Sequence, residues 1–95
     1  MHARVATFQG DPANVDMAVE QVRAEVESGT VPAALEGAKM LMLVDRSTGK
    51  GLGITLFDSE DAMRRGDEAL NAMNPGAGER RLSVEFYEVP VHSLG

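Results

Sequence analysis

The sequence contains no cysteine and no tryptophan, and three phenylalanines and one tyrosine are its only aromatic residues. The absence of cysteine excludes disulfides, thiolate nucleophiles and cysteine-based zinc sites. No apolar run approaches the roughly 20 residues that a membrane-spanning helix needs. The N-terminus, MHARVATF, lacks the charged region and long apolar stretch of a signal peptide. We therefore expect a chain that starts near Met1, a cytoplasmic location and no membrane partner.

The net charge and the length of the chain limit which partners it is expected to bind. The formal net charge of −6 predicts that the chain does not bind nucleic acid or anionic lipid. Acidic residues surround both arginine pairs, Arg64-Arg65 and Arg80-Arg81, which is typical of a solvated surface with salt bridges. Ninety-five residues predict a single domain over 1–95. A chain this short buries only a modest core, so a second copy would add stability.

The prediction of the fold starts from the segment Gly49–Met63, GKGLGITLFDSEDAM. It reads as the end of a tight turn and an alternating strand that leads directly into a helix capped at Asp58-Ser59. The flanking patterns predict strands over 2–9, 38–45 and 81–91, and helices from Asp11-Pro12 to Gly29 and from Ser59 to Met73. Right-handed crossovers then predict an α+β, ferredoxin-like β-α-β-β-α-β fold. Its sheet is antiparallel with strand order 4-1-3-2, and both helices lie on one face.

The two faces of this sheet follow from an assumed pairing of Ala6 with Phe86 and of Val44 with Leu52. That pairing places one apolar set on the uncovered face: Phe8, Met40, Met42, Val44, Leu52, Ile54, Leu56, Val84 and Phe86. It places a second apolar set under the helices: Val5, Thr7, Leu41, Leu43, Thr55, Phe57, Tyr87 and Val89. Because two helices cover only one face, we expect a sheet-to-sheet homodimer with Phe8, Met40, Met42, Ile54, Leu56 and Phe86 in its interface.

The order of the elements and the run from Gly51 to Asp61, GLGITLFDSED, resemble the dimeric α+β barrel proteins of the antibiotic-biosynthesis-monooxygenase-like superfamily. The resemblance implies a ferredoxin-like subunit, a barrel made by two sheets, and a cavity between helices and sheet. Activities in that superfamily include cofactor-independent oxygenation of quinol-like aromatics, haem degradation and isomerisation. The haem-degrading branch uses an Asn, a Trp and a His. Ala3, Phe57 and the segment 66–68 stand at those positions here, which argues against haem degradation.

Tyr87 is the predicted catalytic residue, because a phenol beside hydroxyl groups in an apolar cavity orients or deprotonates a phenolic substrate. The competing interpretation is a core aromatic whose hydroxyl has one partner. The predicted ligand-binding residues are Thr7, Leu41, Thr55, Phe57, Met63 and Gly66. A mid-helix glycine such as Gly66 indicates either close helix packing or room for a ligand.

Two further groupings concern charge. His2, His92 and Glu88 come together at one end of the predicted sheet, but histidines near chain ends are common, and we expect no metal and no cofactor. Arg4 and Glu88 are predicted to form an ion pair on the uncovered face.

The sequence is compatible with two functions. One is a cofactor-independent monooxygenase-like enzyme acting on a small aromatic or quinol-like compound. The other is a non-catalytic dimer that binds a small apolar or aromatic ligand or is only structural.

Overall fold

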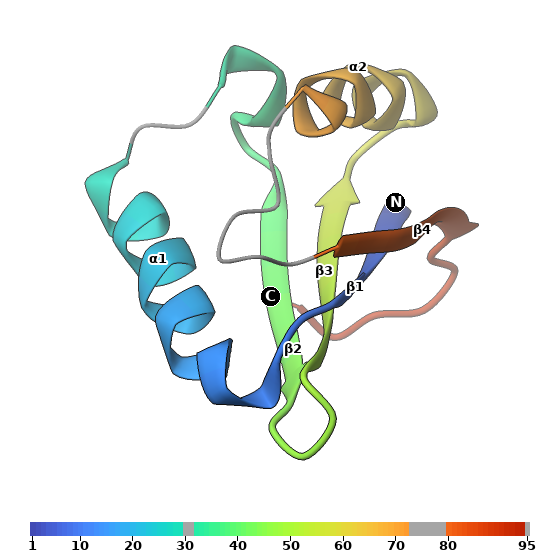
Figure 1. The fold of residues 1–95 in the computed structure, drawn as a ribbon. Helices are drawn as coiled ribbons and strands as arrows, with labels where there is room; N and C mark the ends of the chain where they lie inside the picture. Colours follow the sequence, from blue (N-terminus) through green and yellow to red (C-terminus); the bar gives the residue numbers. More distant parts are fainter. Residues whose placement is uncertain (30–31, 73–79, 95) are drawn as a thin grey trace.

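A computed structural model describes residues 1–29, 32–72 and 80–94, which form a four-stranded antiparallel sheet with two α-helices (Figure 1). The strands are β1 (His2–Gln9), β2 (Lys39–Asp45), β3 (Lys50–Phe57) and β4 (Arg80–Glu88), and the helices are α1 (Val15–Ser28) and α2 (Glu60–Asn71). Short 3-10 turns, η1 (Pro12–Asn14) and η2 (Ala33–Leu35), precede α1 and β2. The order β2-β3-β1-β4 confirms the predicted ferredoxin-like fold. The predicted helix end at Met73 lies outside the described residues.

The helix boundaries follow from their caps. The Asp11 carboxylate accepts a hydrogen bond from Ala13 N at 2.9 Å and starts the turn that leads into α1. Gly29 ends α1 with φ of 70°, the left-handed conformation that glycine adopts without strain. The Ser59 hydroxyl accepts from Ala62 N at 3.1 Å and starts α2, as the sequence predicts.

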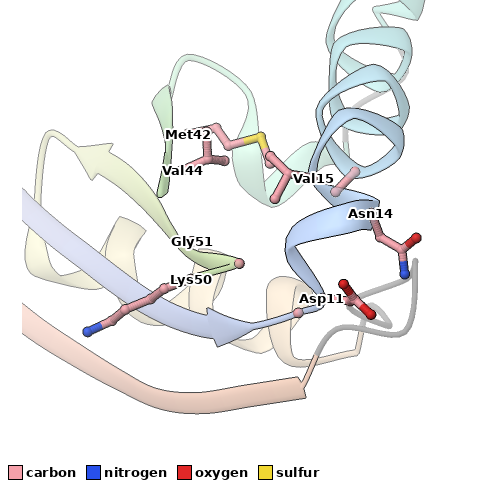
Figure 2. Close-up of a pocket in the computed structure, with 10 residues that line it drawn as sticks. Asp11, Asn14, Val15, Met42, Val44, Lys50 and Gly51 are labelled. Atoms are coloured by element: carbon pink, nitrogen blue, oxygen red, sulfur yellow. The ribbon is translucent and has the colours of Figure 1, made fainter. Parts of the chain in front are cut away.

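Strand pairing shows which side chains share each face of the sheet. Arg4 pairs with Thr55 and Phe86, and Thr55 pairs with Met40, so these four side chains point the same way. The helices cover this face, because the Arg4 guanidinium binds Asp67 of α2. At the other end of the sheet, Met42 and Val44 point toward Val15 at the start of α1 (Figure 2).

We call this side the helix-covered face. It comprises Arg4, Ala6, Phe8, Met40, Met42, Val44, Gly51, Gly53, Thr55, Phe57, Val84 and Phe86. The opposite side is the open face, with Ala3, Val5, Thr7, Leu41, Leu43, Leu52, Ile54, Leu56, Ser83, Glu85 and Tyr87.

The predicted register is wrong in two places. Val44 pairs with Gly51 and not with Leu52, because Asp45 and Lys50 close a four-residue loop held by a 2.9 Å bond from Gly49 N to Asp45 O. Because of this shift of one residue, each β3 side chain shares a face with different residues of the neighbouring strands than predicted. Ala6 pairs with Val84 and not with Phe86, a shift of two residues that leaves the faces unchanged.

As a result, several predicted residues lie on the face opposite to the predicted one. Thr7, Leu41 and Tyr87, predicted to lie under the helices, belong to the open face. Phe8, Met40, Met42 and Phe86, predicted to lie on the uncovered side, belong to the helix-covered face. Ile54 and Leu56 lie on the open face, as predicted.

The segment after β4 crosses one end of the open face. Val89 N donates to Met1 O at 2.9 Å, and the chain then returns toward β2 (Figure 1). There the Lys39 ammonium donates to Leu94 O at 2.6 Å. Ala3 and Leu56, which lie at this end of the open face, are buried. Among the described residues, no other segment covers this face.

The base of α1 is attached to the β2-β3 loop at Gly49. Gly10 N donates to Gly49 O at 3.0 Å, and Arg46 of the same loop forms an ion pair with Asp16 in the first turn of α1. Gly49 has φ of 80°, and a Cβ added there would lie 2.8 Å from Pro12 N and closer still to Gly10 O. Only glycine fits this position, for reasons of both conformation and space.

Replacing Gly49 with alanine should therefore lower the free energy of unfolding by more than the left-handed conformation alone costs. Gly29→Ala is the matched control, because Gly29 has φ of 70° and nothing within 4 Å of an added Cβ. We expect Gly29→Ala to cost about 1 kcal/mol and Gly49→Ala at least about 2 kcal/mol in urea unfolding. Equal losses for the two variants would contradict the close contact at Gly49.

Candidate functional site

A cavity of about 570 Å³ lies between the two helices and the sheet. It exists because α1 packs on the sheet only at its beginning. Val15 and Ala18 are buried, Val22 is half-buried, and Val26 is 58% exposed. The second half of α1 therefore forms a wall of the cavity without closing it. The described lining residues are Arg4, Ala6, Phe8, Val22, Glu25, Val26, Met40, Leu41, Met42, Gly51, Leu52, Gly53, Ile54, Thr55, Leu70, Asn71 and Arg81.

The floor of the cavity is made by residues with small side chains. Ala6 is 1% exposed, and its partner in β3 is Gly53, which has no side chain to fill the space above the sheet. Gly51, on the same face, leaves a second gap. Around this floor stand the apolar side chains of Phe8 and Met42. Glycines in a strand often mark a site of close approach by a ligand, and this pair makes room for one.

A group of polar side chains lies on the wall near α2. The Arg4 guanidinium is 4% exposed, and its Nε donates to Asp67 Oδ1 at 2.7 Å. Its Nη2 donates to Asn71 Oδ1 at 3.1 Å, and Arg81 Nη1 donates to the same oxygen at 2.7 Å. The predicted pairing of Arg4 with Glu88 is wrong, because Arg4 points under α2. A buried arginine requires such partners, since an unpaired buried charge is strongly destabilising.

Sequence reasoning missed this group, although a signal for it exists. Arg4 is a charged residue in the interior of an otherwise apolar strand pattern, and Asp67 and Asn71 are four residues apart on the same face of α2. Together these two observations would have pointed to a buried arginine under the helix.

Beside the cavity, Leu35, Phe57 and Met63 form the small core cluster between α2, η2 and the sheet. A Cβ added at Gly66 would overlap the Phe57 ring and lie 3.3 Å from Leu35 Cδ2. Gly66 therefore serves close helix packing, the first of its two predicted roles. Phe57, Met63 and Gly66 are neighbours of the cavity and are absent from its described lining.

The remaining predicted site residues divide between the two faces. Thr55, predicted to bind ligand, is buried in the cavity floor. Leu41 also belongs to the lining, although strand pairing places its side chain on the open face. Thr7 lies on the open face. Phe8, Met40 and Met42, predicted for a dimer interface, line the cavity instead.

Tyr87 lies on the open face, away from the cavity. Its side chain is 50% exposed, and its hydroxyl donates to Glu85 Oε2 at 2.8 Å. The hydrogen bond to this carboxylate, together with its negative charge, raises the pKa of Tyr87 above the ordinary 10.0. The hydroxyl of this chain's Tyr87 therefore does not reach a ligand in the same chain's cavity.

Two other features add little to the site. A hollow of about 20 Å³ beside Gly49 and Met42 holds no more than a water molecule (Figure 2). Within the described parts of the chain, no three His, Asp or Glu side chains come together as metal ligands.

Neither α1 nor α2 is long and apolar enough to cross a membrane.

The raised pKa of Tyr87 is directly testable, because the chain contains a single tyrosine and no tryptophan. Glu85→Gln removes the carboxylate that disfavours the phenolate, so the pKa should fall toward 10.0. The measurement is an ultraviolet absorbance titration of tyrosinate. Glu88→Gln removes the same charge from the same strand on the other face and should leave the titration unchanged. An unchanged titration in Glu85→Gln would contradict the Tyr87-Glu85 contact.

Comparisons with known proteins support the fold. No protein-family model matches the chain, and no curated protein matches it. Among solved structures, a crystal structure from Deinococcus radiodurans, described as a "putative antibiotic biosynthesis monooxygenase", matches with a TM-score of 0.54 and 18% sequence identity. The match covers 100% of both chains. The chain therefore has the same fold as that protein, a ferredoxin-like α+β fold.

Proposed function

We propose that this protein binds a small aromatic or quinol-like compound in the cavity between helices and sheet and oxidises it as a cofactor-independent, monooxygenase-like enzyme. The observation that carries the proposal is the cavity of about 570 Å³. Its volume lies within the range of about 300–1,000 Å³ that is usual for small-molecule sites. A likeness of fold to a protein described as a monooxygenase agrees with the proposal.

The lining suits a ring system with a few polar substituents. Phe8, Met40, Met42 and Leu70 offer apolar surface, and methionine side chains adapt to varied ring shapes. The Thr55 hydroxyl lies in the floor, and Glu25 is the one carboxylate among the described lining residues. Such a site, mostly apolar with few polar groups, binds and orients one compound.

The proposed reaction needs only the substrate, dioxygen and a base. Glu25 accepts a proton from the substrate, which leaves an electron-rich anion in the apolar site. That anion reduces dioxygen. In the keto tautomer of a phenol, one ring carbon carries two hydrogens. One oxygen atom replaces these two hydrogens as a carbonyl, and the other leaves with them as water. The substrate supplies all the electrons, so the reaction balances without another reductant.

The second candidate is a non-catalytic binding or structural dimer. The position of Tyr87 favours it, because the predicted catalytic hydroxyl points away from the cavity and binds Glu85. Oxygen consumption separates the two candidates, since only the enzyme reduces dioxygen when a ligand is bound.

The open face supports the proposed homodimer. Leu41 and Leu43 of β2 are 47% and 45% exposed, and they adjoin Leu52 and Ile54 of β3. The segment 89–94 covers only the end near Lys39. An apolar patch of this kind on an isolated subunit marks an interaction site, and a second copy offers the same patch with two-fold symmetry.

For the cavity, we expect at least one compound from a set of quinols and phenols to raise the melting temperature and to consume oxygen. Val22→Trp should abolish both effects, because Val22 lines the cavity on the α1 side and a larger ring would fill it. Gln21→Trp is the control, since Gln21 is the exposed neighbour on the same helix. Melting curves and an oxygen electrode give the two readouts.

The outcomes of this screen are distinct. Ligands that raise the melting temperature without oxygen uptake would favour the non-catalytic binder. If no compound binds, or if Val22→Trp binds as the wild type does, the proposed site is wrong.

For the dimer, light scattering should give about twice the 10.1 kDa mass of one chain. Leu43→Glu places two like charges in the proposed interface and should yield monomers at micromolar concentration. Met17→Glu adds the same charge at a 60% exposed position on α1 and should leave the mass unchanged. A wild-type mass near 10 kDa would refute the dimer.

A further inference from the structure

The polar wall of the cavity holds two guanidinium groups close together. Arg4 Nη2 and Arg81 Nη1 both donate to Asn71 Oδ1, at 3.1 Å and 2.7 Å. All three residues line the cavity. They come from β1, β4 and the end of α2, so the tertiary structure brings them together. A single neutral amide oxygen is a weak acceptor for two cations, whereas an anion binds guanidinium groups more strongly.

The charges in this group do not balance. Asp67 compensates Arg4, but Arg81 makes no ion pair within the described residues, so two positive charges face one negative charge. Two like charges bound to the same oxygen repel each other, and water at the exposed Arg81 screens part of this repulsion. A chain with net charge of −6 thus has a locally cationic wall.

Both arginines also have N–H groups left for a ligand. Each guanidinium carries five N–H donors. The described contacts of Arg4 occupy its Nε and one N–H of Nη2, and those of Arg81 occupy one N–H of Nη1. Arg4 is fixed by Asp67 and Asn71, so its free donors are already oriented before a ligand binds.

We propose that the Arg4-Asn71-Arg81 wall binds the carboxylate of an aromatic carboxylic acid, whose ring lies over Ala6 and Gly53 in the cavity. This inference rests on the proposed function and names the substrate class of the same site. A planar carboxylate matches the paired donors of guanidinium groups. The apolar lining accepts the ring, and the two glycines of β3 leave the space for it.

Glu25 sets the orientation of this ligand. It lines the cavity from α1, whereas the arginines line it from the sheet. A carboxylate placed near Glu25 would be repelled, so the acid group turns to the arginines. Water screens the charges of both Glu25 and Arg81, which are exposed, whereas Arg4 is buried and its charge is screened least.

The test compares three probes of the same ring: naphthoate, naphthylmethanol and naphthylmethylammonium. Titration calorimetry with the full chain should show naphthoate binding at least about tenfold more tightly than the alcohol, because charge-assisted hydrogen bonds supply a factor of this size. The ammonium should bind most weakly. Glu25→Gln should strengthen naphthoate binding slightly, because a repulsive charge is removed.

Arg81→Met should weaken naphthoate binding about tenfold to a hundredfold and leave the alcohol within about twofold. Arg80→Met is the matched control. It removes the same charge one residue away, at a position that pairs with Gln9 and is absent from the described lining, so naphthoate affinity should not change. Arg81→Lys keeps the charge and should retain part of the preference. Circular dichroism of each variant checks its fold.

The possible failures are distinguishable. Equal binding of naphthoate and alcohol would overturn the carboxylate inference and leave the proposed cavity standing. Equal losses in Arg80→Met and Arg81→Met would show general surface attraction and would also overturn it. If none of the probes binds, this inference is wrong, and the screen of quinols and phenols decides separately whether the proposed function stands.

Discussion

The partial docking of α1 on the sheet is the constraint from which the rest of the site follows. Its first turns are held through Gly10, Gly49 and the Arg46-Asp16 ion pair, and Val15 and Ala18 pack beneath them. Farther along the helix, Val26 is largely exposed. Because the described contacts fix the helix at its first turns, a space remains above the sheet that would otherwise be core, and its lining is mostly apolar.

Two glycines and one buried arginine determine the shape and the charge of that space. Gly51 and Gly53 remove two side chains from the middle of the sheet, and Arg4 brings a guanidinium under α2. A buried arginine without partners would destabilise the fold, so Asp67 and Asn71 are needed for stability as well as for orientation. The same contacts keep the free donors of Arg4 in place. Stability and the proposed ligand recognition therefore depend on the same side chains.

The register error shows where sequence reasoning reaches its limit. Alternation in Lys50–Phe57 predicts a strand, and Ser59 correctly predicts the helix that follows. The pairing partner of Val44 depends on the number of residues in the loop, and apolar residues at both alternating positions give no preference for either face. A one-residue difference moved Tyr87 out of the predicted cavity and brought Met42 and Phe8 into it.

The sequence by itself determined the element order, the caps at Asp11, Gly29 and Ser59, and the ferredoxin-like topology, because these depend on local propensities and on the handedness of crossovers. Only the tertiary structure decided which apolar face lies under the helices and that Arg4, Asn71 and Arg81 meet on one wall. Those features join residues far apart along the chain, and their contacts depend on register and packing, which no local pattern encodes.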